Sequence, residues 1–174
     1  MTSIFLLDSL KDVTEDAVCE LYMPVYIKDD GEQEQFRVPE VFKMRLPDST
    51  SARKKAPYII HQVITGKEQQ EQGKQSSSRV NIRSIFCVYC RDEQEGSLML
   101  LNAIERVRQA FLKKPIIGGC FELDKKAGVE FLIYPDDTAP FYSGEMSSVW
   151  LLPEVQDERG SDFLHSDVWS EEQL

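Results

Sequence analysis

The chain has 174 residues, of which 41% are hydrophobic, and its 30 acidic and 20 basic residues give a net charge of −10. A chain of this length can bury about 70% of the surface that its unfolded form exposes, so we expect a single domain that needs no metal or disulfide to fold. No apolar run approaches the roughly 18 residues that span a bilayer. We therefore expect no membrane segment or signal peptide, and thiols kept in a reducing compartment. The acidic balance also argues against general nucleic-acid binding.

The negative charge is concentrated at the C-terminal end of the sequence. From Glu154 to Leu174 there are seven acids and one base, Arg159, so this segment carries −6 of the −10. We predict a domain over residues 1–153 followed by an acidic, solvated arm, 154–174. A second interpretation is that the arm docks on a neighbour as a short helix, with four apolar residues along one side: Phe163, Leu164, Val168 and Trp169.

Residues 1–56 indicate a helix followed by an extended segment. From Thr2 to about Ala17, with Ser3 as the expected N-cap, four apolar residues fall near helical spacing: Phe5, Leu6, Leu10 and Val13. Prolines at 24, 39 and 47 exclude a continuous helix over the next thirty or so positions. They predict extended backbone at a sheet edge or wrapped over a surface. A loop rich in Ser, Lys and Arg should follow, between Asp48 and Ala56.

Residues 57–153 should contain the core sheet, beginning with a long hairpin. The segment 58–65 is apolar and β-branched, and 79–89 alternates so that Val80, Ile82, Phe86 and Val88 share one face. Between them lies the polar stretch GKEQQEQGKQSSS, residues 66–78, which can contribute little to a core. We expect it to project into solvent or towards a partner. Its candidate contact residues are Lys67, Glu68, Gln70, Gln72 and Lys74.

A helix and three strands are predicted after the hairpin. From about Ser97 to Lys113 one apolar stripe recurs with helical period: Leu100, Leu101, Ile104, Val107 and Phe111. Acids before its first turn, lysines at its end and Pro115 just beyond agree with helix termini. Strands are expected at 120–123, 129–134 and about 144–152. The fold class is therefore α+β, an antiparallel or mixed sheet with a long hairpin packed against one or two α-helices.

No pattern in the sequence predicts an active site, a cofactor or a metal site. Cys87 and Cys90 form a CxxC motif, but residues three apart on a strand point to opposite faces. The other candidate zinc ligands, Cys19, Cys120, His61 and His165, are scattered singly. We therefore expect the cysteines of this motif to be buried and structural. His61, inside an apolar strand, is expected to be a hydrogen-bonded or edge-facing histidine rather than a general base. We predict that the chain is no enzyme.

Four stretches carry a resemblance to a known family. They are residues 56–60 at the strand start, the polar hairpin tip, Gly96-Ser97-Leu98 leading into Asn102–Arg108, and Pro140–Trp150. The N-x-I-E-R-[IV]-R helix and the P-[FY]-[YW]-x-G-E-[ML] closing segment are similar to those of bacteriophage tail terminator, or tail completion, proteins. The order of elements from Pro57 to Val155 also resembles that family, whose members are neck components that cap the tail tube where it meets the head.

The resemblance implies a structural virion protein in the tail near the neck, assembled in the host cytoplasm. Copies would form a hexameric ring on the last ring of tail tube protein, stop polymerisation, and offer a surface to a neck or head-tail connector protein. The resemblance implies no contact with a membrane and no specific binding of nucleic acid, although DNA would pass through the ring. The N-terminal segment and the acidic arm depart from the family pattern, which leaves open a role in holding a neck or sheath component. Two alternatives also stay open: a head-tail joining or other neck protein, and a non-viral protein-binding module.

Overall fold

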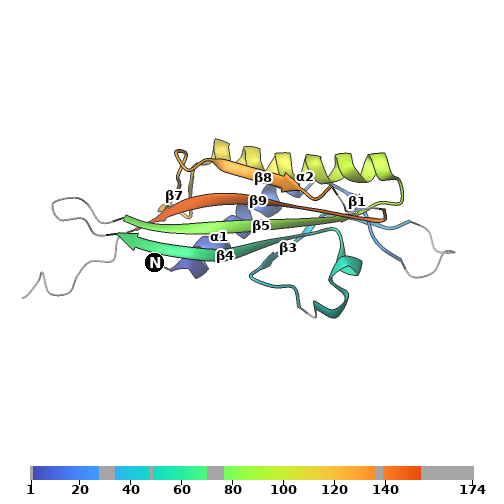
Figure 1. The fold of residues 1–174 in the computed structure, drawn as a ribbon, viewed down its shortest axis with the longest axis horizontal. Helices are drawn as coiled ribbons and strands as arrows, with labels where there is room; N and C mark the ends of the chain where they lie inside the picture. The colour runs from blue at the N-terminus through green and yellow to red at the C-terminus, as the bar shows by residue number, and fades with distance from the viewer. Residues whose placement is uncertain (1, 28–33, 48, 70–76, 136–138, 154–174) are drawn as a thin grey trace, which may run out of the picture.

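The computed structural model describes residues 2–27, 34–47, 49–69, 77–135 and 139–153. Within these residues the chain forms two α-helices, a short 3-10 helix and nine strands, seven of them in one sheet. The sheet is mixed, because β3 and β4 are parallel and the other neighbouring strands are antiparallel. The predicted α+β class, with a long hairpin packed against helices, is confirmed (Figure 1).

Three long strands form the centre of the sheet. They are β4 (Tyr58–Gln69), β5 (Ser77–Tyr89) and β9 (Phe141–Leu152), and they lie in that order. On the outer side of β4 lies β3 (Glu40–Lys43), so the predicted extended segment does end at a sheet edge. Two strands pair with the other edge of β9, namely β7 (Phe121–Leu123) and β8 (Val129–Ile133). β6 (Ile116–Ile117) pairs with β7. β6 was not predicted, and β9 begins three residues earlier than the expected residue 144.

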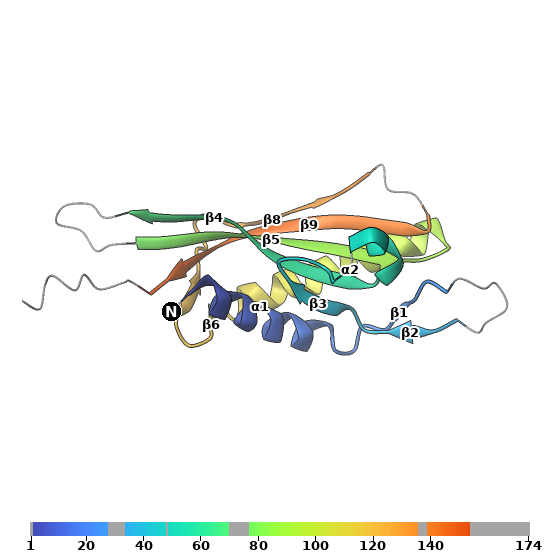
Figure 2. The ribbon, with the colours of Figure 1, turned by 90° about the horizontal axis from the view of Figure 1, so that it is seen from below.

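Both α-helices pack on the same face of this sheet, as Figure 2 shows from below. Helices α1 (Ser3–Val18) and α2 (Glu93–Lys113) also contact each other. The large side chains buried between the helices and the sheet include Leu6, Leu10, Ile59, Ile82, Phe86, Leu100, Ile104, Phe111 and Trp150. The alternation predicted for β5 is confirmed, because Val80, Ile82, Phe86 and Val88 all belong to this core. Residues far apart in the sequence therefore share one hydrophobic core.

Helix α1 differs from its prediction in two details. Its N-cap is Thr2 rather than Ser3, and the Thr2 side chain makes no capping hydrogen bond. Phe5 is 58% exposed, whereas Leu7 is buried. The buried side of the helix contains Thr14 together with its leucines, and a polar residue on that side is not visible to a hydrophobicity pattern.

Helix α2 begins four residues earlier than the predicted Ser97. The N-cap is Asp92, whose carboxylate accepts a hydrogen bond from the Glu95 amide at 2.9 Å, so the acids expected before the helix form its cap and first turn. Gly96 is a helical residue under the ring of Tyr142. A Cβ at this position would clash with that ring. The predicted apolar stripe is otherwise confirmed, with only Leu101 left half-buried.

The cap of α2 gives a first testable prediction. Asp92→Ala removes the acceptor for the Glu95 amide and an acid near the positive end of the helix dipole, so the free energy of unfolding should fall by about 1 kcal/mol. Asp92→Asn keeps an N-cap oxygen and should lose much less. Urea unfolding of the three proteins followed by circular dichroism measures this. Equal losses for the two variants would show that the side-chain hydrogen bond does not stabilise the helix.

The opposite face of the sheet is covered at one end only. There a second apolar cluster contains Ala56, Tyr58, Ile60, Cys87 and Tyr89. Tyr26, Phe42 and Leu46, from the segment around β1 (Met23–Pro24), β2 (Phe36–Arg37) and β3, pack against it. The expected Ser/Lys/Arg-rich loop contains a 3-10 helix, Ser49–Lys55. The remainder of this face is referred to below as the open face.

Candidate interaction surface

The structure describes two of the eight residues predicted to contact partners. Lys67 and Glu68 are exposed and lie in the last part of β4. The others lie outside the described residues: Gln70, Gln72 and Lys74 in the hairpin tip, and Phe163, Leu164 and Trp169 in the C-terminal arm. The described part of the candidate surface therefore consists of the hairpin strands and their surroundings.

The hairpin strands extend beyond the helices. Their pairing runs from Tyr58 opposite Cys87 to Gln69 opposite Ser77, and β9 follows β5 as far as Leu152 opposite Ser78. In both views the ends of β4 and β5 reach past the first turn of α1 (Figures 1 and 2). The strand pairing thus carries the chain well away from the helix-covered core.

The outer edge of β4 is paired only along its first half. β3 runs beside residues 58–61, and the Met44 amide then donates to the His61 carbonyl at 2.8 Å. Met44 has a positive φ of 62°, and there the chain leaves the sheet. A β-bulge follows at Ile64, which is 50% exposed. From Ile64 to Gln69 no other strand of the described chain lies beside β4. This half of the edge presents unpaired backbone groups, which are a template for pairing with another chain.

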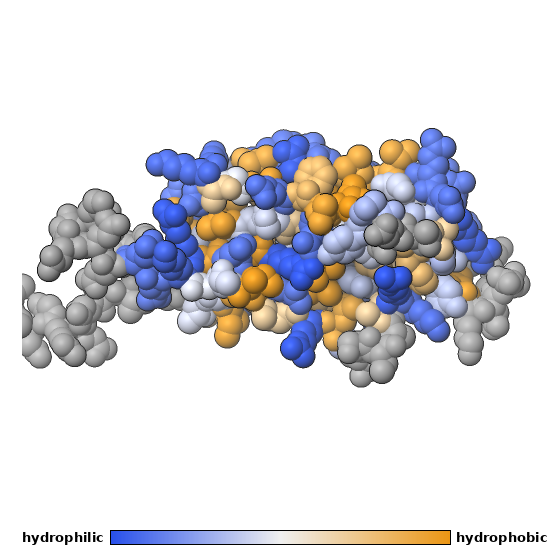
Figure 3. All heavy atoms as spheres, viewed as in Figure 1, coloured by the Kyte–Doolittle hydropathy of each residue, from blue (hydrophilic) through white to orange (hydrophobic). Residues whose placement is uncertain are grey.

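The open face carries a charged cluster beside β9. Arg83 Nε donates to Glu145 Oε2 at 2.6 Å, and Tyr134 Oη donates to the same oxygen at 2.6 Å. The hydrogen bonds from Tyr134 and Arg83 hold the pKa of Glu145 below its usual value. Nearby in β5, Asn81 Oδ1 is buried without a hydrogen-bond partner among the described residues. Polar and apolar side chains are interspersed on the face seen in Figure 3.

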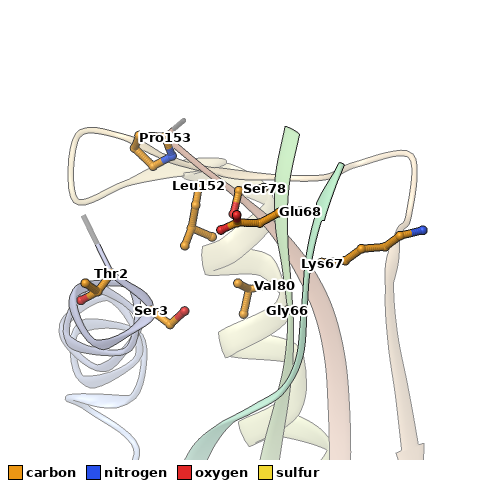
Figure 4. A pocket seen from close by; sticks show the side chains of 9 residues that line it. All are labelled: Thr2, Ser3, Gly66, Lys67, Glu68, Ser78, Val80, Leu152 and Pro153. Carbon is orange, nitrogen blue, oxygen red and sulfur yellow. The ribbon is translucent and has the colours of Figure 1, made fainter. Parts of the chain in front are cut away.

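A cavity of about 500 Å³ opens between α1 and the far end of the central strands (Figure 4). We call it the Gly66 cavity, after the glycine of β4 in its wall. Val80 of β5 and Leu152 of β9 supply apolar lining, while Thr2 and Ser3 line it from the N-terminus of α1. Lys67 points away from it, whereas Glu68 points into it, towards Leu152. The full lining is Thr2, Ser3, Gly66, Lys67, Glu68, Ser78, Val80, Leu152 and Pro153.

Several large apolar side chains outside the core remain exposed. At the cavity end of the molecule they are Ile4 at 65% and Phe5 at 58%, both in the first turns of α1. Along the β8 edge, Phe131 and Leu132 are 41% and 54% exposed. Single exposed apolar residues are ordinary, but groups beside a cavity or a sheet edge are typical of protein-protein contacts.

Cys87, Cys90 and His61 are buried, whereas Cys19 is exposed and Cys120 is half-buried. Cys87 belongs to the cluster on the second face and Cys90 to the main core, so the CxxC motif does point to opposite faces of the sheet. His61 is fully buried, with Nε2 2.9 Å from Thr14 Oγ1 and Nδ1 2.8 Å from Ser84 Oγ. Burial lowers its pKa to about 3, so the ring is neutral at physiological pH. Its predicted hydrogen-bonded role is confirmed. In the described part of the chain, no three His, Cys, Asp or Glu residues are grouped as metal ligands would be.

Comparison with known proteins identifies no family for this chain. No protein-family model matches this chain, and no curated protein matches it. Among the described residues, neither helix is long and apolar enough to cross a membrane.

Proposed function

We propose that this chain is a structural virion subunit, a tail terminator whose copies form a ring that caps a phage tail tube and offers a surface for head or neck attachment. The observation that carries the proposal is the long β4–β5 hairpin, whose β4 edge has no neighbouring strand in the described chain from Ile64 onwards. The stretches that resemble the terminator family fall on the start of this hairpin, on α2 and on β9.

A ring subunit needs a rigid body and an edge that reaches its neighbour. The helix-covered sheet supplies the body, and the half-open β4 edge can accept a strand through main-chain hydrogen bonds. An interface between two different patches on each copy closes into a ring when the rotation between copies is right. Lys67 and Glu68, with opposite charges at adjacent exposed positions of β4, would help to set the register of such a contact.

The proposal is tested by the mass of the full chain in solution, measured by light scattering with and without tail tube protein. A monomer that becomes a closed ring on the tube, and that shortens the tubes by capping them, is the expected result. Lys67→Glu should weaken ring formation about tenfold, because it replaces the cation of the edge pair with a second acid. Lys125→Glu is the matched control, since Lys125 is equally charged and exposed but lies in the β7–β8 turn.

Two results would end the terminator proposal. One is a chain that stays monomeric in the presence of tube protein. The other is a tube length distribution that the chain leaves unchanged. If the ring forms but both charge reversals leave it intact, the terminator role stands and the β4 edge is not its interface.

A further inference from the structure

We propose that the Gly66 cavity is the docking site of the chain's own C-terminal arm, residues 154–174, with Phe163 and Leu164 as the anchoring side chains. This intramolecular contact would cover the cavity end of the molecule. It goes beyond the ring proposal and does not depend on it, since it concerns a single copy of the chain.

The first observation is that the structure leaves room for a side chain at Gly66, which is exposed and lies two residues after the β-bulge at Ile64. A Cβ on Gly66 would lie 3.9 Å from Val80 Cγ2, which is an ordinary contact. Gly144 of β9 is different, since a Cβ there would lie 2.9 Å from the Leu132 carbonyl oxygen. Glycine weakens a strand, and where the chain's own packing does not require it, it often marks the close approach of another backbone. The glycine therefore leaves room in the cavity wall for an occupant.

The path of the chain indicates which segment that occupant is. β9 ends at Leu152, and both Leu152 and Pro153 line the cavity, so the arm starts at its rim. Phe163 and Leu164 follow Pro153 by ten and eleven residues (163 − 153 and 164 − 153). Closing a loop of this length has a modest entropy cost, and a short tether gives an effective concentration of about millimolar. At micromolar protein concentration the chain's own arm therefore has the advantage over a neighbour's arm.

The charges around the cavity fit an acidic occupant at the α1 end. Helix α1 has no acid in its first turn, and its N-cap side chain makes no capping hydrogen bond, whereas α2 has both features. A carboxylate from the arm, which has seven acids and one base, would interact favourably with the positive end of the α1 dipole. Glu68, whose side chain points into the cavity near Leu152, would repel the same acids. The arm is thus directed towards α1, where the exposed Ile4 and Phe5 offer apolar contact to Phe163 and Leu164.

Limited trypsin digestion of the full chain tests the contact, because Arg159 is the only basic cleavage site in the arm. Mass spectrometry follows the loss of residues 160–174. Gly66→Leu fills the cavity and should accelerate this cleavage about fivefold or more, as expected when the protecting contact is lost. Thr65→Leu is the matched control, since it adds the same side chain one position earlier on β4, where residue 65 is exposed and does not line the cavity.

A second variant keeps the test independent of any effect of Gly66→Leu on folding. Phe163→Ser with Leu164→Ser alters only the arm, and it should accelerate cleavage at Arg159 to the same extent. Equal cleavage rates in the unaltered chain and in both variants would overturn the proposal. So would protection that persists in Gly66→Leu. Protection that increases with protein concentration would assign the cavity to the arm of a second copy and overturn the intramolecular contact.

Discussion

Phe111→Ala is expected to lower the free energy of unfolding by ~4 kcal/mol. Phe111 lies on α2 with no exposed surface, and its ring packs edge-on against Trp150 of β9, with centroids 5.4 Å apart and an interplanar angle of 84°. The centroid of the His61 ring, on β4, lies 6.2 Å from that of Phe111. Alanine would remove the aromatic contact and leave a cavity between α2 and two strands of the sheet.

The next residue provides the control for this prediction. Leu112 is 39% exposed on the same turn of α2, so Leu112→Ala should lower the free energy of unfolding by less than about 1 kcal/mol. Urea unfolding followed by circular dichroism, and separately by tryptophan fluorescence, measures both variants. Similar losses for Phe111→Ala and Leu112→Ala would contradict the assignment of Phe111 to the core that joins α2 to the sheet.

The parts of the fold that sequence reasoning predicted well are those with one strong period. The stripe ending at Phe111 and the alternation from Val80 to Val88 each place their predicted residues on one face, and the structure buries them there except for Leu101, which is half-buried. The ends of elements were predicted less well. Asp92 and Gly96 have the residue types of a loop, and only the capping hydrogen bond and the contact with Tyr142 show that they belong to α2.

The candidate surface depends on long-range placement, which a single sequence does not reveal. The polar stretch after Gly66 predicted a projecting hairpin, but not that β3 would leave β4 at Met44 and expose half of its edge. The Gly66 cavity combines α1 with the ends of β4, β5 and β9, which are distant in sequence. Gly66 itself was a detectable signal, as an isolated glycine at the end of an apolar strand pattern.

His61 was predicted to be a hydrogen-bonded strand residue, but its partners come from α1 and β5 and could not be predicted. Together Thr14, His61 and Ser84 form a buried polar network that connects the three elements. The neutral imidazole can donate through one ring nitrogen to one hydroxyl and accept through the other nitrogen from the second hydroxyl. Protonation would place an uncompensated charge in the core. The network therefore makes stability depend on pH.

The direction of this dependence follows from the two pKa values of His61. In the folded chain burial lowers the pKa to about 3, whereas the unfolded chain should titrate near 6.5. Between these values the unfolded state binds a proton that the folded state does not, so stability is fully present above about pH 6.5 and falls as the pH decreases below it. The slope approaches ~1.4 kcal/mol per pH unit, which gives a loss of ~2 kcal/mol by about pH 5.

Urea unfolding at a series of pH values between about 7.5 and 5 measures the effect above the range in which most carboxylates titrate. The chain has two histidines, and His165→Asn should leave the slope unchanged if His61 is its source. His61→Asn should abolish the slope, whatever it does to stability at neutral pH, because it removes the group whose protonation differs between the two states. A slope that persists in His61→Asn would mean that other groups cause it. A flat profile in the unaltered chain would show that the folded protein accepts a proton at His61 near its ordinary pKa, which the burial of the ring beside Thr14 and Ser84 argues against.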